Sequence, residues 1–138
     1  MPVNIATQAR NAAGSAIVAL LDQGSNNANG YMEIRTGTKP PNPQMPTTGT
    51  LLATFSFSNP AFGAFGNGTA LANSMLADTN VANDGIAGWF RCYNRDGIAI
   101  FDGDVSLTGG GGDIEFDNIN FSQGGTAQII SLSSNMPM

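Results

Sequence analysis

Polar and apolar residues alternate in short runs separated by turn residues, and this limits the fold more than any other feature of the sequence. Successive side chains of a strand point to opposite faces, so a period of two predicts a strand with one apolar face. In residues 50–57 that face is apolar enough to predict a strand at the centre of a sheet. Seven or eight strands are predicted, over residues 31–36, 50–57, 69–76, 86–93, 98–105, 113–116, 119–121 and 126–133.

The spacing of the turn signals indicates how these strands are arranged. Short strands separated by turns every eight to twelve residues or so are typical of antiparallel sandwiches and barrels. The sequence therefore predicts a mainly β fold, a single antiparallel β-sandwich or barrel-like domain with one N-terminal α-helix.

The clearest local pairing is a hairpin whose turn contains Asp96 and Gly97, a dipeptide that favours tight β-turns. A two-residue loop would pair charge with charge and apolar with apolar across the strands. The expected pairs are Arg91–Asp102, Cys92–Phe101 and Tyr93–Ile100. A longer loop over residues 94–97 would shift this register, and both alternatives remain open at this point.

A helix is predicted over residues 5–21, where the apolar spacing changes to that of one helical face. Asn4 or Thr7 is expected to cap its start, and Gly24 to supply the left-handed residue that ends it. The face expected to be buried consists of Ala9, Ala13, Ala16, Ile17, Leu20 and Leu21.

The 138 residues are expected to form one domain, because a chain of this length can bury a core of its own. Its parts are an N-terminal arm and helix over residues 1–24 and a β-sandwich over residues 30–138. Between the first two strands, residues 39–46 contain four prolines, which exclude a helix and a central strand. This segment is predicted to be an extended connector.

Charged residues are scarce, and this restricts the partners of the chain. They make up 11% of the sequence, against roughly 25% in an ordinary soluble domain. Low charge suits a surface that other subunits cover, because burying charged groups in an interface is costly. With a net charge of −5 and no basic cluster, nucleic acid is not an expected partner. The apolar run 16–21 is too short for a signal peptide or a membrane span, so synthesis in the cytoplasm and no membrane partner are expected.

The side chains available for chemistry argue against an enzyme. There is no histidine, and the single cysteine, Cys92, lies in an apolar run, so the usual triads, dyads and zinc sites lack their parts. No catalytic, cofactor-binding or metal-binding residue is predicted. Two alternatives rest on a group of carboxylates, either a glycosidase acting through them or a bound calcium ion. The group consists of Asp102, Asp104, Asp113, Glu115 and Asp117, and the aromatic residues that a sugar would need are Trp89, Tyr31 and Tyr93.

An ordered series of turn and core residues resembles a family of small structural proteins of tailed bacteriophages, encoded in their structural gene clusters. The resemblance covers nearly the whole chain and includes no catalytic motif. It rests on residues Arg10–Ala13, Ala19–Asp22, Ile34–Pro40, Gly49–Ala53, Asn59–Gly63, Gly88–Arg91 and Ile100–Gly103.

The resemblance implies a component of the virion, and we expect a head decoration or cement protein that binds the major capsid protein lattice on the capsid surface. The implied partners are the major capsid protein and further copies of this chain, with a trimer suggested by capsid geometry. A tail or baseplate component is the alternative. A glycan-binding module for adhesion is a further hypothesis, which predicts that glycan affinity falls when Trp89 is replaced.

Overall fold

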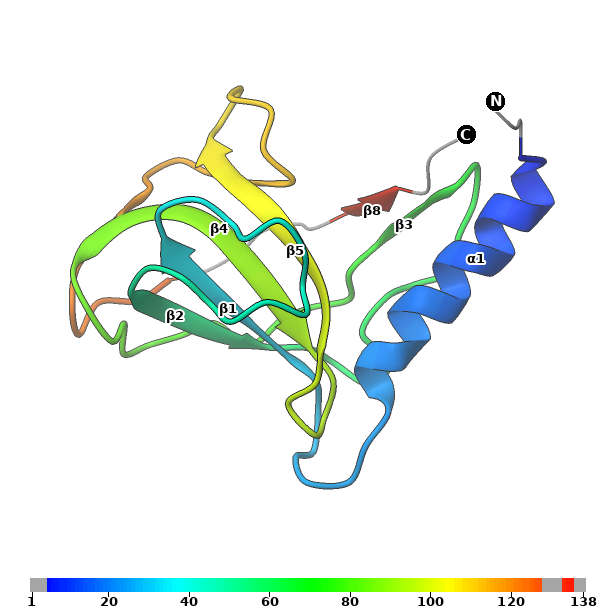
Figure 1. Cartoon of the computed structure of the whole chain (residues 1–138), viewed down its shortest axis with the longest axis horizontal. Helices are drawn as coiled ribbons and strands as arrows, with labels where there is room; N and C mark the ends of the chain where they lie inside the picture. Colours follow the sequence, from blue (N-terminus) through cyan, green and yellow to red (C-terminus); the bar gives the residue numbers. More distant parts are fainter. Residues whose placement is uncertain (1–4, 128–132, 136–138) are drawn as a thin grey trace.

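The computed structural model describes residues 5–127 and 133–135. One helix, α1 (Thr7–Ala19), is extended by a single 3₁₀ turn, η1 (Leu20–Asp22), and precedes all the strands (Figure 1). The strands are β1 (Tyr31–Thr36), β2 (Leu51–Ser56), β3 (Thr69–Leu71), β4 (Gly85–Tyr93), β5 (Ala99–Leu107), β6 (Ile114–Phe116), β7 (Asn120–Phe121) and β8 (Ser133–Asn135). The predicted mainly β fold with one N-terminal helix is confirmed.

The main sheet has the strand order β2-β1-β4-β5-β6, and β7 pairs with the first residues of β4. It curls into an open half-barrel, while β3 and β8 form a separate two-stranded ladder beside it (Figure 1). The predicted strand over residues 126–133 falls largely outside the described residues. Of its described residues, Ala127 forms an isolated bridge with Asp78, and Ser133 is the first residue of β8.

One pairing differs from the antiparallel prediction, because β5 and β6 run parallel. A parallel connection usually takes a dozen residues or more, whereas here Val105 pairs with Ile114. The short return is possible because Gly109 and Gly111 adopt positive φ angles of 85° and 84°. Residues that carry a Cβ rarely adopt such angles. The sequence pattern does not predict this return, because a run of glycines is compatible with many turn conformations.

The hairpin of β4 and β5 has the longer of the two loops considered. Arg91 pairs with Asp102 and Cys92 with Phe101, as predicted, but Tyr93 pairs with Ala99 instead of Ile100. The shift arises because the Asn94 side chain accepts hydrogen bonds from the backbone N–H groups of residues 96 and 98. An Asn that binds the backbone ahead of it widens a turn in this way.

Strand β2 lies at the end of the main sheet, so its predicted central position is wrong. The apolar face of β2 is buried against the core. An edge strand can bury one face as completely as a central strand does, so the apolar pattern does not distinguish the two positions. The free edge is covered by residues 76–83, where the Asp78 carboxylate accepts the N–H of Thr54 at 2.8 Å and the Asn83 amide donates to the carbonyl of Leu51 at 3.0 Å. The Ala82 N–H also binds the carbonyl of Leu52.

The core lies on the inner face of the half-barrel, and the predicted helix face is confirmed only in part: Leu21 is buried in the core and Ile17 is half-buried. Gly14 and Val18 of the helix are buried, and Gly14 is packed so tightly against the Phe65 ring that a Cβ there would overlap it. Ala9, Ala13 and Ala16 are exposed instead. The core cluster comprises Val18, Leu21, Met32, Ile34, Leu52, Ala53, Phe55, Phe57, Ala61, Phe62, Ala70, Val81, Ala87, Phe90, Cys92, Val105, Ile114, Phe116, Phe121 and Ala127.

The ends of α1 also differ from prediction. Ala6 occupies the N-cap position with no side-chain hydrogen bond, Thr7 is already helical, and Asn4 lies outside the described residues. Gly24, which follows η1, has the predicted positive φ of 121°. None of the helices in the described ranges is long and apolar enough to cross a membrane.

Candidate functional site

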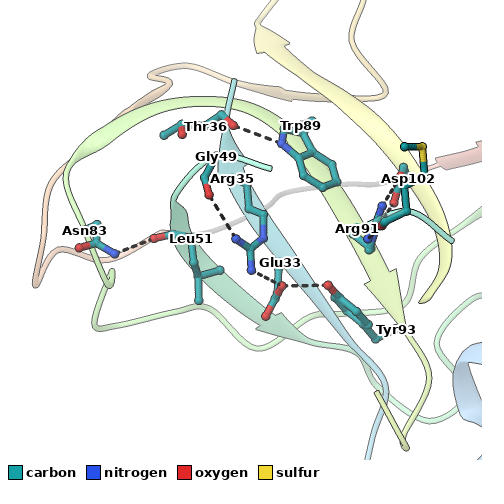
Figure 2. Close-up of polar contacts among 11 residues, drawn as sticks. Glu33, Arg35, Thr36, Gly49, Leu51, Asn83, Trp89, Arg91, Tyr93 and Asp102 are labelled. Carbon is teal, nitrogen blue, oxygen red and sulfur yellow. Dashed lines mark hydrogen bonds and ion pairs between the residues drawn. The ribbon is translucent and has the colours of Figure 1, made fainter. Parts of the chain in front are cut away.

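The side of the main sheet that faces away from the core carries a row of polar and aromatic side chains. Alternation along β1 and β4 places Glu33 and Arg35 on this outer face with Trp89, Arg91 and Tyr93 (Figure 2). In the register of the two strands Tyr31 lies beside Tyr93, Glu33 beside Arg91, and Arg35 beside Trp89. We call these six residues, with Asp102 of β5, the outer-face cluster.

A buried ion pair lies at the centre of the outer-face cluster. The Arg91 guanidinium donates to both carboxylate oxygens of Asp102, from Nε at 2.6 Å and from Nη2 at 3.0 Å. Its Nη1 donates to the carbonyl of Met45 at 2.7 Å. The two charged side chains are only 4% and 5% exposed, so the pairing must compensate for the loss of water around both. The hydrogen bonds to Asp102 raise the pKa of Arg91.

Trp89 is fully buried on the same face, although it does not belong to the core cluster. Its indole N–H donates to the carbonyl of Thr36 at 3.2 Å, and the Arg91 guanidinium lies 5.3 Å from its ring centroid. A cation over an aromatic face is attracted by the ring's electron density. With no exposed surface, Trp89 cannot serve directly as the glycan platform that the sequence hypothesis places there.

The proline segment covers Trp89 and Arg91. It lies back against its own sheet, where the Met45 carbonyl accepts a hydrogen bond from Arg91. Just after the segment, the Gly49 carbonyl accepts a hydrogen bond from Arg35. The chain crosses the sheet so closely that a Cβ at Gly88 would overlap the carbonyl oxygen of Gly37. The segment connects β1 to β2, as predicted, and also covers part of the outer face.

Next to this cover, two tyrosines stack on each other. The rings of Tyr31 and Tyr93 have centroids 4.8 Å apart and an interplanar angle of 18°. The Tyr93 hydroxyl donates to Glu33 at 3.1 Å, and Glu33 also pairs with Arg35 at 3.1 Å. Burial, followed by the nearby Glu33 charge, raises the pKa of Tyr93 to about 12. These contacts fix both rings on the sheet.

An open groove of about 460 Å³ lies on the β2 side of Tyr31. Its lining residues come from β1, β2 and the loop that precedes β1. They are Asn27, Ala28, Asn29, Tyr31, Thr54 and Ser56. In the sequence, Tyr31 is only one of three aromatic residues that a sugar could contact. What distinguishes Tyr31 is its place at the start of β1, where it pairs with Tyr93 of β4 on one side and with Ser56 of β2 on the other. This pairing is not apparent from the sequence.

The acidic residues predicted as a possible catalytic or calcium site hold separate parts of the structure. Asp102 pairs with Arg91, Asp113 accepts the N–H of Asp104 at 2.9 Å, and Asp117 accepts the hydroxyl of Thr108 at 2.9 Å. Glu115 accepts the N–H groups of Gly109 and Gly111, which closes the tight return between β5 and β6. Over the described ranges, His, Cys, Asp and Glu side chains form no group of three that could hold a metal ion.

Glu115 and Asp117 do border a second hollow, of about 400 Å³, in which Phe116 and Phe121 provide apolar walls. Asp102 is not among its lining residues, so the structure does not bring Asp102 and Glu115 together in one cavity. Of the five carboxylates in the glycosidase alternative, this hollow brings together Glu115 and Asp117.

Cys92 lies on the core face and is completely buried. Burial holds the pKa of its thiol well above the ordinary value, since an apolar surrounding disfavours the thiolate. Because the thiolate is the reactive form, this side chain is a packing residue.

The hairpin tip carries a charge-dependent contact with the loop after η1. The Asp96 carboxylate accepts the N–H groups of Ser25 at 2.8 Å and Asn26 at 3.0 Å, which lower its pKa. A lowered pKa means that this contribution to stability is present above the ordinary carboxyl value of 3.8 and is lost as pH falls through the folded-state pKa.

We therefore expect Asp96→Asn to flatten the acid side of the stability curve. The melting temperature of the wild-type chain should fall more steeply with decreasing pH than that of the variant. Calorimetry at a series of acidic pH values measures both, and Asp104→Asn is the control, because Asp104 is exposed. Parallel curves for the wild-type chain and Asp96→Asn would show that the Ser25 and Asn26 contacts do not depend on charge.

Comparisons with protein-family models, with curated proteins and with solved structures found no match. The likeness to tailed-phage structural proteins accordingly stays a prediction from the residues. Two surfaces of the chain are candidates for binding. One is the outer face of the main sheet with the groove beside it, and the other is the exposed, uncharged side of α1.

Proposed function

We propose that this chain is a non-enzymatic structural protein of a tailed-phage particle, a capsid decoration or cement protein that packs against copies of itself and against the major capsid protein. The observation that carries the proposal is the exposed side of α1. Sequence resemblance supplies the phage context, and the helix supplies a surface suited to assembly.

The exposed side of α1 is apolar, small and free of charge. Alanines 9, 12, 13, 16 and 19 are exposed along it, and Leu20, 39% exposed, continues it. The one charged residue of the helix, Arg10, lies on another side, where a Cβ at Gly68 would overlap its guanidinium. A helix that faces water usually carries charged residues on its outer side. We call the five alanines and Leu20 the alanine face.

The position of the helix favours contact with another molecule. In Figure 1, α1 runs along the outside of the molecule, with β3 between it and the main sheet. Small side chains let a second helix approach closely, and interface cores are depleted of charged residues. A symmetric oligomer would bring copies of the same face together, which suits the trimer proposed from capsid geometry.

The remainder of the domain would serve as the rigid body of this unit. In the proposal it is a barrel-like or sandwich domain, in which the β3–β8 ladder and the loop before β3 close the open side of the curled sheet. Support comes from the core cluster, which joins Phe62 and Ala70 of this region to Phe55 and Phe90 of the main sheet. Because the proline segment is folded onto the sheet, the proposal assigns contact with neighbouring molecules to the helix.

We expect Ala13→Glu to disrupt self-association. The change places a carboxylate in the middle of the alanine face, where an interface would have to remove it from water. The dissociation constant of the oligomer should rise by about tenfold or more. Sedimentation velocity on the full chain measures it, and Ser15→Glu is the matched control, because Ser15 is exposed on the same helix outside the alanine face.

Electron cryomicroscopy of intact particles tests the location. Many copies over the head, lost in particles that carry Ala13→Glu but retained with Ser15→Glu, are the expected result. A few copies at the tail would instead support the tail or baseplate alternative. A monomeric wild-type chain that is absent from particles would contradict the proposal.

A further inference from the structure

We propose that the groove beside Tyr31 binds a neutral saccharide. This goes beyond the structural role proposed above and rests on different residues from the alanine face. The groove is defined by Asn27, Ala28, Asn29, Tyr31, Thr54 and Ser56, and its volume of about 460 Å³ falls within the range of small-ligand sites.

The shape of the groove follows from a step in side-chain size across three strands. Tyr31 of β1 pairs with Tyr93 of β4 on one side and with Ser56 of β2 on the other. One face of its ring is covered by the stacked Tyr93 ring. The neighbours on the β2 side are short, so the ring forms a wall there and the Thr54 and Ser56 side chains line the groove beside it.

The chemistry of the lining fits a sugar better than other small ligands. It offers one aromatic ring, two carboxamides and two hydroxyls, and none of the six residues carries a charge. An aromatic face packs against the C–H face of a pyranose ring, while amides and hydroxyls both donate and accept hydrogen bonds from sugar hydroxyls. An anionic ligand would find no cation among the lining residues, and an apolar ligand would stay largely exposed in so open a groove.

The walls are fixed before any ligand binds. The Asn27 loop is joined to the hairpin by three hydrogen bonds with Arg95, one from the Asn27 backbone N–H, one from its side-chain amide and one from the Arg95 guanidinium to the Asn27 carbonyl. On the opposite wall, Tyr93 is held by Glu33, which keeps the Tyr31 ring in position through stacking. A preformed site avoids the loss of conformational freedom that weakens binding.

Several groove groups are available to a ligand. Within the described part of the chain, the side chains of Asn29, Thr54 and Ser56 make no hydrogen bonds, although the Thr54 backbone N–H is bound by Asp78. The side-chain amide of Asn27 donates to Arg95, which leaves its oxygen as an acceptor. The groove therefore presents both donors and acceptors next to an aromatic wall.

The test is titration of the full-length chain with lactose, maltose, cellobiose and N,N′-diacetylchitobiose. Saturation-transfer difference NMR and calorimetry detect binding and measure its affinity. We expect at least one of these neutral disaccharides to bind. Tyr31→Ala should weaken binding by about tenfold or more, because it removes the aromatic wall. Tyr31→Phe, which keeps the ring, should retain most of the affinity.

Ser56→Phe separates loss of the groove from loss of the fold. It fills the groove while the Tyr31–Tyr93 stack remains, so it should abolish binding with an unchanged melting temperature. The inference is overturned if none of the four sugars binds, or if Tyr31→Ala and Ser56→Phe both bind as the wild-type chain does. A preference for sulfated over neutral sugars would equally contradict it.

Discussion

Replacing Asp102 with alanine is expected to destabilise the chain by about 3–5 kcal/mol, the usual cost of leaving one partner of a buried ion pair without the other. Arg91 would keep its charge in a position that is almost completely shielded from water, with the Met45 carbonyl and the Trp89 ring in place of a carboxylate. Urea denaturation measures the change in the free energy of unfolding. Such a loss is a large fraction of the total stability of a small domain, which is about 5–15 kcal/mol.

The double variant Arg91→Met/Asp102→Leu is the control for this result. It removes both charges and fills the space with apolar groups, so it should be clearly more stable than Asp102→Ala alone. A double variant as unstable as the single one would show that the pair acts through its shape and not through its charges.

Trp89→Ala is expected to cost about 3–5 kcal/mol as well, as truncation of a fully buried large side chain does. It also removes the hydrogen bond to the Thr36 carbonyl and the ring beneath Arg91. Hydrogen exchange followed by mass spectrometry should show faster exchange in residues 37–50, which cover this ring. Trp89→Phe keeps a ring in place and should cost less.

Two outcomes would contradict this account of Trp89. One is a variant that loses less than about 1 kcal/mol, the size of an average surface or minor substitution. The other is a large loss without faster exchange in residues 37–50, which would mean that the ring supports the sheet alone. Because Trp89 and Arg91 touch, the effects of Trp89→Ala and Asp102→Ala should not add when combined.

The strands of the main sheet could be predicted because their information is local. A period of two marks β1, β2, β4 and β5 directly, and the Arg91–Asp102 and Cys92–Phe101 pairs follow from a turn signal and matching chemistry. The helix face could not be predicted in the same way. Alanine is small enough to fit either inside or outside, and the buried side is decided by Phe65, which lies far along the chain and packs on Gly14.

The burial of the outer-face cluster could not be predicted, for a related reason. In an alternating strand the polar side is expected to face water, so Arg91 and Glu33 look like solvated residues in the sequence. What buries Arg91 is a proline-rich segment about 45 positions earlier, and no local pattern reports that it folds back over the sheet. The groove depends on the order of strands across the sheet, which the sequence leaves open.

The covered edge of β2 affects how the chain behaves at high local concentration, where aggregation through strand edges is favoured. An exposed edge strand is a template onto which another chain can add, and fibrous aggregates grow by repeating that step. Here the Asp78 carboxylate and the Asn83 amide already occupy backbone groups of that strand, and Asp78 would bring a charge into any intruding chain. Even where copies of the chain are held close together, this edge gives polymerisation no starting point.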